Sequence, residues 1–167
     1  MRNVVIYDYL IYIVLCYTQF YLGKYNISKY LPNIVLIMIV YIALKKGALQ
    51  AEIIGFILGI ILDVISIDIF GLKAMTFTIL GYSCGKLLIN FDSENIIIQI
   101  IAILLESLVY YIIINTMHFL FLYKYKQTMI FTLTYHPYSM LMSTGITIVT
   151  TPIIFKFLAC LNKMLNK

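Results

Sequence analysis

The residues in this chain with the most chemical potential are carboxylic acids inside long apolar segments. Asp63 lies near the end of one apolar run, Glu106 near the middle of another, and Asp8 near the beginning of a third. An acid at membrane depth must face protein, water or a partner. Asp63 and Glu106 are therefore candidates either for a structural or partner-binding role or for a role in proton or substrate movement. Asp8 has a further alternative, because it can also reach the membrane surface.

Most residue patterns that would indicate catalysis or metal binding are missing from the sequence. It contains no H-E-x-x-H or G-x-x-x-x-G-K-[ST] motif. The letters G-x-S-x-G occur at residues 81–85, but within an apolar segment that we expect to be helical, whereas the catalytic form of this motif lies on a turn between a strand and a helix. His118 and His136 stand 18 residues apart, and neither has a Cys, Asp or Glu at the spacing of metal ligands. Asp63 and Asp68 lie five residues apart with no third ligand nearby. We therefore expect no enzyme activity, no metal and no cofactor.

Small residues recur at helical spacing in two consecutive apolar segments. Residues four apart lie on one face of a helix, and the two faces consist of Ala51, Gly55, Gly59 and Asp63, and of Ala74, Thr78, Gly81 and Gly85. Small residues let helix backbones approach closely in a membrane. The pattern predicts that the two helices pack against each other or that one packs on a partner.

Polar residues share a face in three other segments. These faces carry Asp8, Tyr12, Cys16 and Gln19; Gln99, Glu106 and Tyr110; and Ser139, Ser143, Thr147 and Thr151. For the hydroxyl-bearing face, the simplest interpretation is that the side chains donate to carbonyl groups of their own helix.

The overall composition is that of an integral membrane protein. Of the 167 residues, 63% are hydrophobic and only 11% are charged, and the mean hydropathy is +0.99. Soluble domains have about 25% charged residues. The composition excludes a disordered chain, a disulfide-stapled module and a nucleic-acid-binding arm, and the length leaves no room for a soluble catalytic domain beside the membrane segments.

Hydropathy predicts an all-α polytopic membrane protein with about six transmembrane helices in one bundle, forming a single domain over residues 1–167. The expected spans are 4–22, 31–49, 51–67, 72–89, 96–122 and 137–161, with 123–136 as a loop. The net charge of +5 is explained by cations that flank the spans. Six spans place seven Lys and Arg residues on one side and five on the other, which favours both termini in the cytoplasm.

The central part of the chain resembles the bacterial rod shape-determining protein MreD family. Residues 31–41, LPNIVLIMIVY, are similar to the opening of that family's pattern, and residues 55–66, GFILGIILDVIS, to its segment G-F-x-x-G-x-x-x-D-x-x-S. Phe70-Gly71-Leu72-Lys73-Ala74, Gly81-Tyr82 and the proline-containing segment 151–155 follow at matching positions.

The resemblance implies a non-catalytic scaffold of the cell-elongation machinery in the cytoplasmic membrane, acting in rod shape and lateral peptidoglycan synthesis. Its implied partners are MreC, the MreB filaments, and RodA with its transpeptidase. The family's fold is similar to the substrate-binding subunits of energy-coupling-factor transporters, so the alternative is a membrane-embedded vitamin-binding subunit. The expected partner-binding or helix-packing residues are Pro32, Asn33, Gly55, Gly59, Asp63, Ser66, Gly71 and Gly81.

Overall fold

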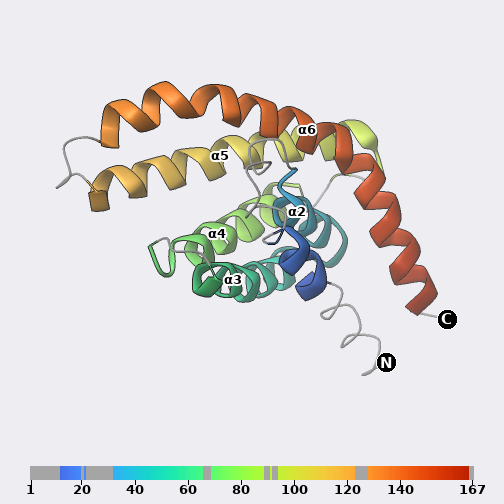
Figure 1. Ribbon diagram of the computed structural model, residues 1–167. Helices are drawn as coiled ribbons and strands as arrows, with labels where there is room; N and C mark the ends of the chain where they lie inside the picture. Colours follow the sequence, from blue (N-terminus) through green and yellow to red (C-terminus); the bar gives the residue numbers. More distant parts are fainter. Residues whose placement is uncertain are drawn as a thin grey trace.

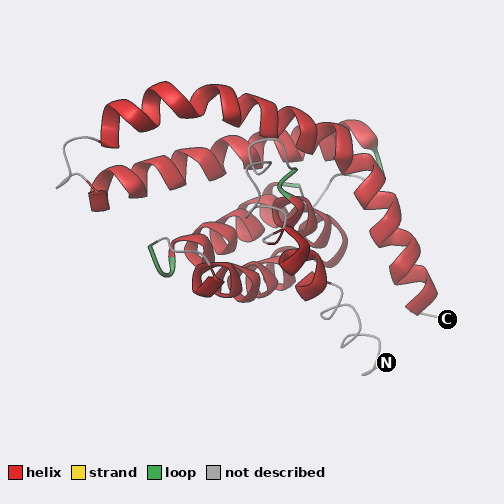
Figure 2. Cartoon of the chain, in the orientation of Figure 1, coloured by secondary structure: helices red, strands yellow, loops and turns green. Residues whose placement is uncertain are grey.

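The fold is helical throughout the part of the chain that the computed structural model describes, namely residues 12–19, 21, 32–65, 69–88, 91, 94–122 and 128–165. Residues 12–19 form a short helix, and five longer helices follow (Figures 1 and 2). They are α2 (Ile34–Lys46), α3 (Ala48–Ile65), α4 (Leu72–Leu87), α5 (Ile96–Leu122) and α6 (Thr128–Leu165). The prediction of an all-α protein is confirmed. Asp8 lies outside the described residues.

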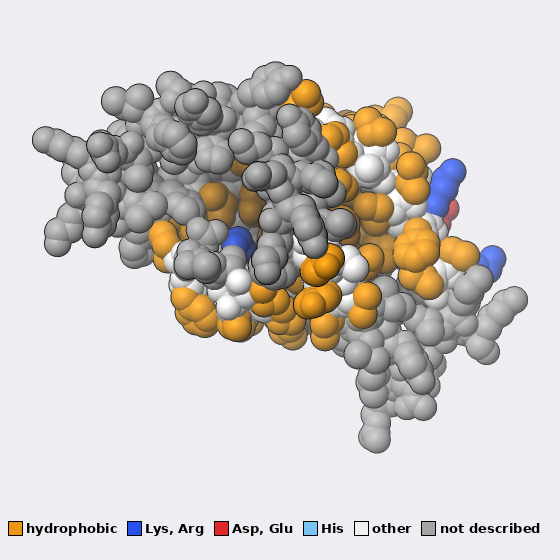
Figure 3. Space-filling view, viewed as in Figure 1, with side chains coloured by type: hydrophobic (Ala, Val, Ile, Leu, Met, Phe, Trp, Pro, Cys, Tyr) orange, Lys and Arg blue, Asp and Glu red, His pale blue; other side chains and the backbone are white. Residues whose placement is uncertain are grey.

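Among the described residues, three helical segments are long and apolar enough to cross a membrane: Ala48–Ile65, Ile96–Met117 and Leu141–Leu161. Hydrophobic side chains make up most of the described surface in Figure 3, and Lys and Arg side chains appear only at separate points. The surface is therefore that of a membrane protein. The six-span layout stays a prediction, because α2 has only 13 residues and α4 has 16.

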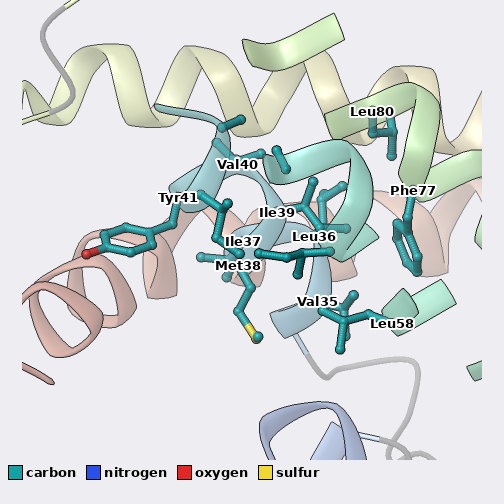
Figure 4. Close-up of a cluster of buried hydrophobic side chains, with 14 of the residues drawn as sticks. Val35, Leu36, Ile37, Met38, Ile39, Val40, Tyr41, Leu58, Phe77 and Leu80 are labelled. Carbon is teal, nitrogen blue, oxygen red and sulfur yellow. The ribbon is translucent and has the colours of Figure 1, made fainter. Parts of the chain in front are cut away.

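The centre of the fold is α2. Every residue from 35 to 43 is buried, and α2 contacts α3, α4, α5 and α6. In Figure 4, side chains from α2 meet Leu58 of α3 and Phe77 and Leu80 of α4, while Tyr41 points toward α6. The Tyr41 ring packs edge-on against Phe155, with 5.2 Å between centroids. A helix that is apolar on all sides lies either in a protein core or in the membrane. Other helices cover α2, which is about 20 Å long, and it therefore serves as a core helix.

The backbone between α2 and α3 turns at a single residue. Gly47 has a φ of 91°, in the left-handed region that glycine adopts without steric cost. Its N–H donates to the Ala43 carbonyl, closing α2, and its carbonyl accepts from the Ala51 N–H, opening α3. The predicted segment 31–49 therefore comprises α2, this turn and the first residues of α3.

The two longest helices, α5 and α6, lie side by side across one face of the group formed by α2, α3 and α4 (Figure 1). The sequence prediction of a loop extending to His136 was wrong, because α6 begins at Thr128. Apolar residues such as Ile130 and Leu133 continue the helical run past the polar residues that suggested a loop. Further along, α6 bends in its C-terminal part, which contains Pro152, a residue without the N–H needed for helix hydrogen bonding.

Candidate functional site

The two stripes of small residues predicted from the sequence meet each other in an antiparallel seam between α3 and α4. A Cβ atom added at Gly55 would lie 2.6 Å from the Phe77 carbonyl oxygen, and one at Gly81 would lie 2.7 Å from the Ala51 carbonyl. A Cβ at Gly59 or at Gly85 would overlap the backbone of Ala74 or Ala48, respectively. The first of the two expected arrangements is therefore present: the glycines pack helix on helix within the chain. They are buried there and form no exposed docking surface.

Asp63 joins α3 to the beginning of α4 at one end of this seam. Its carboxylate accepts hydrogen bonds from two backbone N–H groups, Lys73 N–H at 3.1 Å and Ala74 N–H at 3.0 Å. Gly71, the N-cap residue, has a φ of 88° and no side chain that could cap the helix. Asp63 thus supplies the N-terminal cap that α4 lacks. Asp63 therefore links α3 to α4 by hydrogen bonds next to the Gly71 turn.

The N–H groups of the first four residues of α4 all have acceptors. The Leu72 N–H donates to the Ile69 carbonyl and the Met75 N–H to the Gly71 carbonyl, and Asp63 takes the two between them. The carboxylate also lies at the positive end of the helix dipole, where negative charge is stabilised. The N–H groups of these four residues are therefore paired, which matters in a membrane protein because an unpaired group in the bilayer costs several kcal/mol.

Asn33 holds the N-terminus of α2 at a junction of three helices. Its Oδ1 accepts from the Leu36 N–H at 3.1 Å and from Gln19 Nε2 at 3.3 Å. Gln19 Oε1 accepts from the Val35 N–H at 2.9 Å, and the Asn33 N–H donates to Thr147 Oγ1 at 3.1 Å. Pro32 precedes Asn33, which is the N-cap residue, and α2 begins at the next residue, Ile34.

The threonines of the hydroxyl-bearing face of α6 donate to their own helix, as expected. Thr147 Oγ1 donates to the Ser143 carbonyl and Thr151 Oγ1 to the Thr147 carbonyl, each at 2.6 Å. Thr147 differs in that its oxygen also accepts from Asn33. Gln19 and Thr147 both lay on polar faces identified in the sequence, but spacing could not show that they meet at Asn33.

Glu106 is buried in α5 and contacts α4 through Ser83. The Ser83 hydroxyl lies 3.2 and 3.3 Å from the two Glu106 carboxyl oxygens and 3.1 Å from the Leu80 carbonyl oxygen. A serine hydroxyl has one proton to donate. Ser83 therefore donates this proton to the Glu106 carboxyl or to the Leu80 carbonyl of its own helix, and its contact with Glu106 joins α4 to α5. Spacing marked Glu106 as a buried acid, but its partner Ser83 was missed.

We expect Ser83→Ala to lower stability by about 1 kcal/mol, because interhelical hydrogen bonds in membranes contribute about 0.6–2 kcal/mol. The substitution removes the hydroxyl that contacts the buried carboxyl. In a Glu106→Leu background the same Ser83→Ala change should have no effect, because no carboxyl remains. Thermal unfolding of the four proteins in detergent forms a double-mutant cycle that measures the coupling. Equal losses in both backgrounds would show that the two side chains do not interact.

An apolar groove runs along the outer side of the α3–α4 pair. Its volume is about 430 Å³, and its lining includes Phe56, Ile60, Phe70, Ala74, Met75 and Thr78. Its large side chains are exposed, with Phe70 71% and Met75 49% accessible. The Thr78 hydroxyl donates to the Ala74 carbonyl at 2.6 Å, so its polarity is satisfied within α4. Sequence reasoning missed this groove, because periodic apolar positions do not distinguish a groove from a smooth lipid-facing surface.

The predicted site residues fall into separate parts of the structure. Gly55, Gly59 and Gly81 lie in the seam, Asp63 and Gly71 at the start of α4, and Pro32 and Asn33 at the start of α2. Ser66 and Asp68 lie outside the described residues, as do the side chains of both histidines. Among the residues that are described, no group of three or more His, Cys, Asp or Glu side chains could hold a metal ion.

Comparison with known protein families matches residues 3–161 to the rod shape-determining protein MreD. Comparison with curated proteins and with solved structures found no match. The family match covers nearly the whole chain and includes the α3–α4 pair, the Asp63 cap and the Asn33 junction. It gives no support to the alternative of a vitamin-binding transporter subunit. This chain belongs to the MreD family of rod shape-determining proteins and is a membrane protein connected with bacterial cell shape.

Proposed function

We propose that this protein is a non-catalytic scaffold of the cell-elongation machinery, which maintains rod shape and lateral peptidoglycan synthesis through contacts of its helix faces. The observation that carries the proposal is the apolar groove on the outer side of α3 and α4. The glycine seam and the Asp63 cap fix the two helices that form it. A groove between fixed helices keeps its shape when a partner is absent, which lowers the entropic cost of binding.

The chemistry of the groove selects an apolar helix as its occupant. The groove is lined by large side chains, including Phe56 and Met75, and by the small residues Gly71 and Ala74. Because α3 is long and apolar enough to cross a membrane, a partner has to reach the groove from within the bilayer. Small residues let a second helix approach closely. The single membrane span of MreC is the occupant that we propose.

In this proposal the wall-synthesis enzymes do not bind in the groove themselves. MreC bound in the groove would bring its envelope domain into a fixed position on this chain. RodA, its transpeptidase partner and the MreB filaments would then join through MreC or through other faces of the bundle. This arrangement requires no reactive residue in the chain itself.

We propose a multi-pass location in the bacterial cytoplasmic membrane with both termini in the cytoplasm. Several lysines gather at one end of the bundle, which supports this orientation. Gly85 of α4 packs beside Ala48 of α3, so Lys86 and Lys46 lie at the same end of the bundle. The Lys45–Glu94 ion pair shows that the beginning of α5 lies at this end as well. Cations collect on the cytoplasmic side of membrane proteins.

Filling the groove should separate this protein from MreC. Thr78→Phe places an aromatic ring in the groove, and we expect at least a tenfold loss of MreC on co-purification, which corresponds to about 1.4 kcal/mol. Cells that depend on this variant should become round. Ile112→Phe is the matched control, because Ile112 is 64% exposed on α5 and does not line the groove. Rod-shaped cells and full MreC recovery with Thr78→Phe would contradict the proposal.

A further inference from the structure

A second cavity lies at the end of the bundle where the lysines gather. Its volume is about 240 Å³, and it is lined from α2 by Tyr41 and Lys45, from the start of α5 by Glu94, Ile96 and Gln99, and from α6 by residues that include Phe155 and Lys156. Pockets that enclose a whole drug-sized ligand measure about 300–1,000 Å³. The cavity is therefore of a size for a headgroup rather than for a complete molecule.

The depth of the cavity places it at the membrane surface. Ile96 is the first residue of one candidate span, Ile96–Met117, and Lys156 lies close to the end of another, Leu141–Leu161. The wall is mixed in character, because Ile96 and Phe155 are apolar while Lys45, Glu94 and Lys156 are charged. A wall of this mixed character can bind a lipid at the boundary between its polar headgroup and its apolar acyl chains.

The electrostatics of the cavity favour an anion. Two lysines face one carboxylate, and that carboxylate is paired with Lys45 at 3.2 Å. Glu94 is 81% exposed in its side chain, whereas that of Lys45 is 29% exposed, so water screens the acid more than the base. The N-terminus of α5 also opens here, and it adds the partial positive charge of a helix beginning.

From these observations we propose that the cavity between α2, α5 and α6 binds the phosphate-bearing headgroup of an anionic phospholipid. Lys156 and Lys45 provide the charge, and Ile96 and Phe155 contact the first part of the acyl chains. A basic pocket between membrane helices is a known kind of lipid-headgroup site. The bound lipid would join the core helix α2 to both long helices at the membrane surface.

Native mass spectrometry of the full chain, purified in detergent and mixed with phosphatidylglycerol or with phosphatidylcholine, tests the proposal. The protein should retain several times more phosphatidylglycerol. Lys156→Gln should lower this retention about fivefold, the effect of one cation near an anionic lipid surface. Lys156→Arg should keep it, and Lys163→Gln, an exposed lysine of the same helix outside the cavity, should leave it unchanged.

Glu94→Gln should have the opposite effect on lipid retention, because it removes the negative charge and releases Lys45 from its ion pair. Retention of phosphatidylglycerol should increase. Variants that merely loosen the fold would lower retention in both cases. Equal retention of the two lipids, or no response to either variant, would overturn the proposal. Displacement of the lipid by an equal concentration of inorganic phosphate would overturn it as well, because the ligand would then be free phosphate.

Discussion

Replacing Gly59 with alanine should abolish most of the folded protein, although it adds only one methyl group. The new Cβ would overlap the Cα and amide nitrogen of Ala74, and backbone atoms of a neighbouring helix cannot turn aside as a flexible side chain can. The two helices would have to separate, which would also loosen the contacts at Gly55, Gly81 and Gly85. We expect a loss of about 3 kcal/mol or more, at the upper end for overpacking.

Gly145→Ala is the matched control for this substitution. Gly145 also lies within a helix, α6, but a Cβ added there would meet no atom within 4 Å. Alanine is favoured over glycine in a helix by about 1 kcal/mol, so this variant should be as stable as the parent or more stable. Size-exclusion chromatography and thermal unfolding followed by circular dichroism compare the two. Equal unfolding temperatures for Gly59→Ala and Gly145→Ala would show that α3 and α4 are not in close contact.

The α3–α4 seam is the part of the structure that could be predicted best from the sequence. A spacing of four residues in both segments placed Gly55 and Gly59 on one face and Gly81 and Gly85 on another. A face of a membrane helix that is formed by small residues usually packs closely against another helix. The pattern could not show which pairs of residues meet, because the register depends on the turn between the helices. That turn follows from Asp63 and Gly71, which lie eight residues apart in the chain.

The role of α2 was harder to predict because hydropathy measures only how apolar a segment is. A run of 10–14 apolar residues is more typical of a buried core helix than of a span, and α2 has 13 residues. Prediction joined α2 to the residues after Gly47 because the apolar run up to Leu44 is too short for a bilayer unless flanking residues are added. The positive φ of Gly47 ends the helix there, and the sequence alone does not reveal the backbone angle of a glycine.

The groove and the lysine-lined cavity could not have been predicted from the sequence. Each is formed by residues of helices whose mutual placement depends on packing. Phe56 of α3 and Met75 of α4 line the same groove, and Lys45 and Lys156 line the same cavity although more than a hundred residues separate them in the chain. Periodicity gives the direction of each side chain around its own helix axis. The relative rotation and depth of two helices depend on all their contacts together.

Replacing Asp63 with alanine should damage a single end of the α3–α4 pair and, through it, the groove. The Lys73 and Ala74 N–H groups would lose their acceptor, and Gly71 has no side chain to take its place. Loss of an N-cap costs about 1 kcal/mol, and a buried unsatisfied N–H costs about 1–3 kcal/mol more. We expect a total loss of about 2–4 kcal/mol, with Asp63→Asn in between, because an amide offers one acceptor oxygen in place of two.

Hydrogen exchange measured by mass spectrometry distinguishes this local effect from general unfolding. In Asp63→Ala, amides at the start of α4 should exchange faster, while those in the centre of α2 should keep their protection. Glu52→Ala is the control, because Glu52 is an acid of the same helix that makes no contact with the α4 cap. Unchanged exchange at the start of α4 would contradict the capping role. Because Gly71 and Ala74 line the groove, fraying of this turn should also lower MreC recovery, whereas Glu52→Ala should not. Asp63 would then affect partner binding through the shape of the groove, without touching the partner itself.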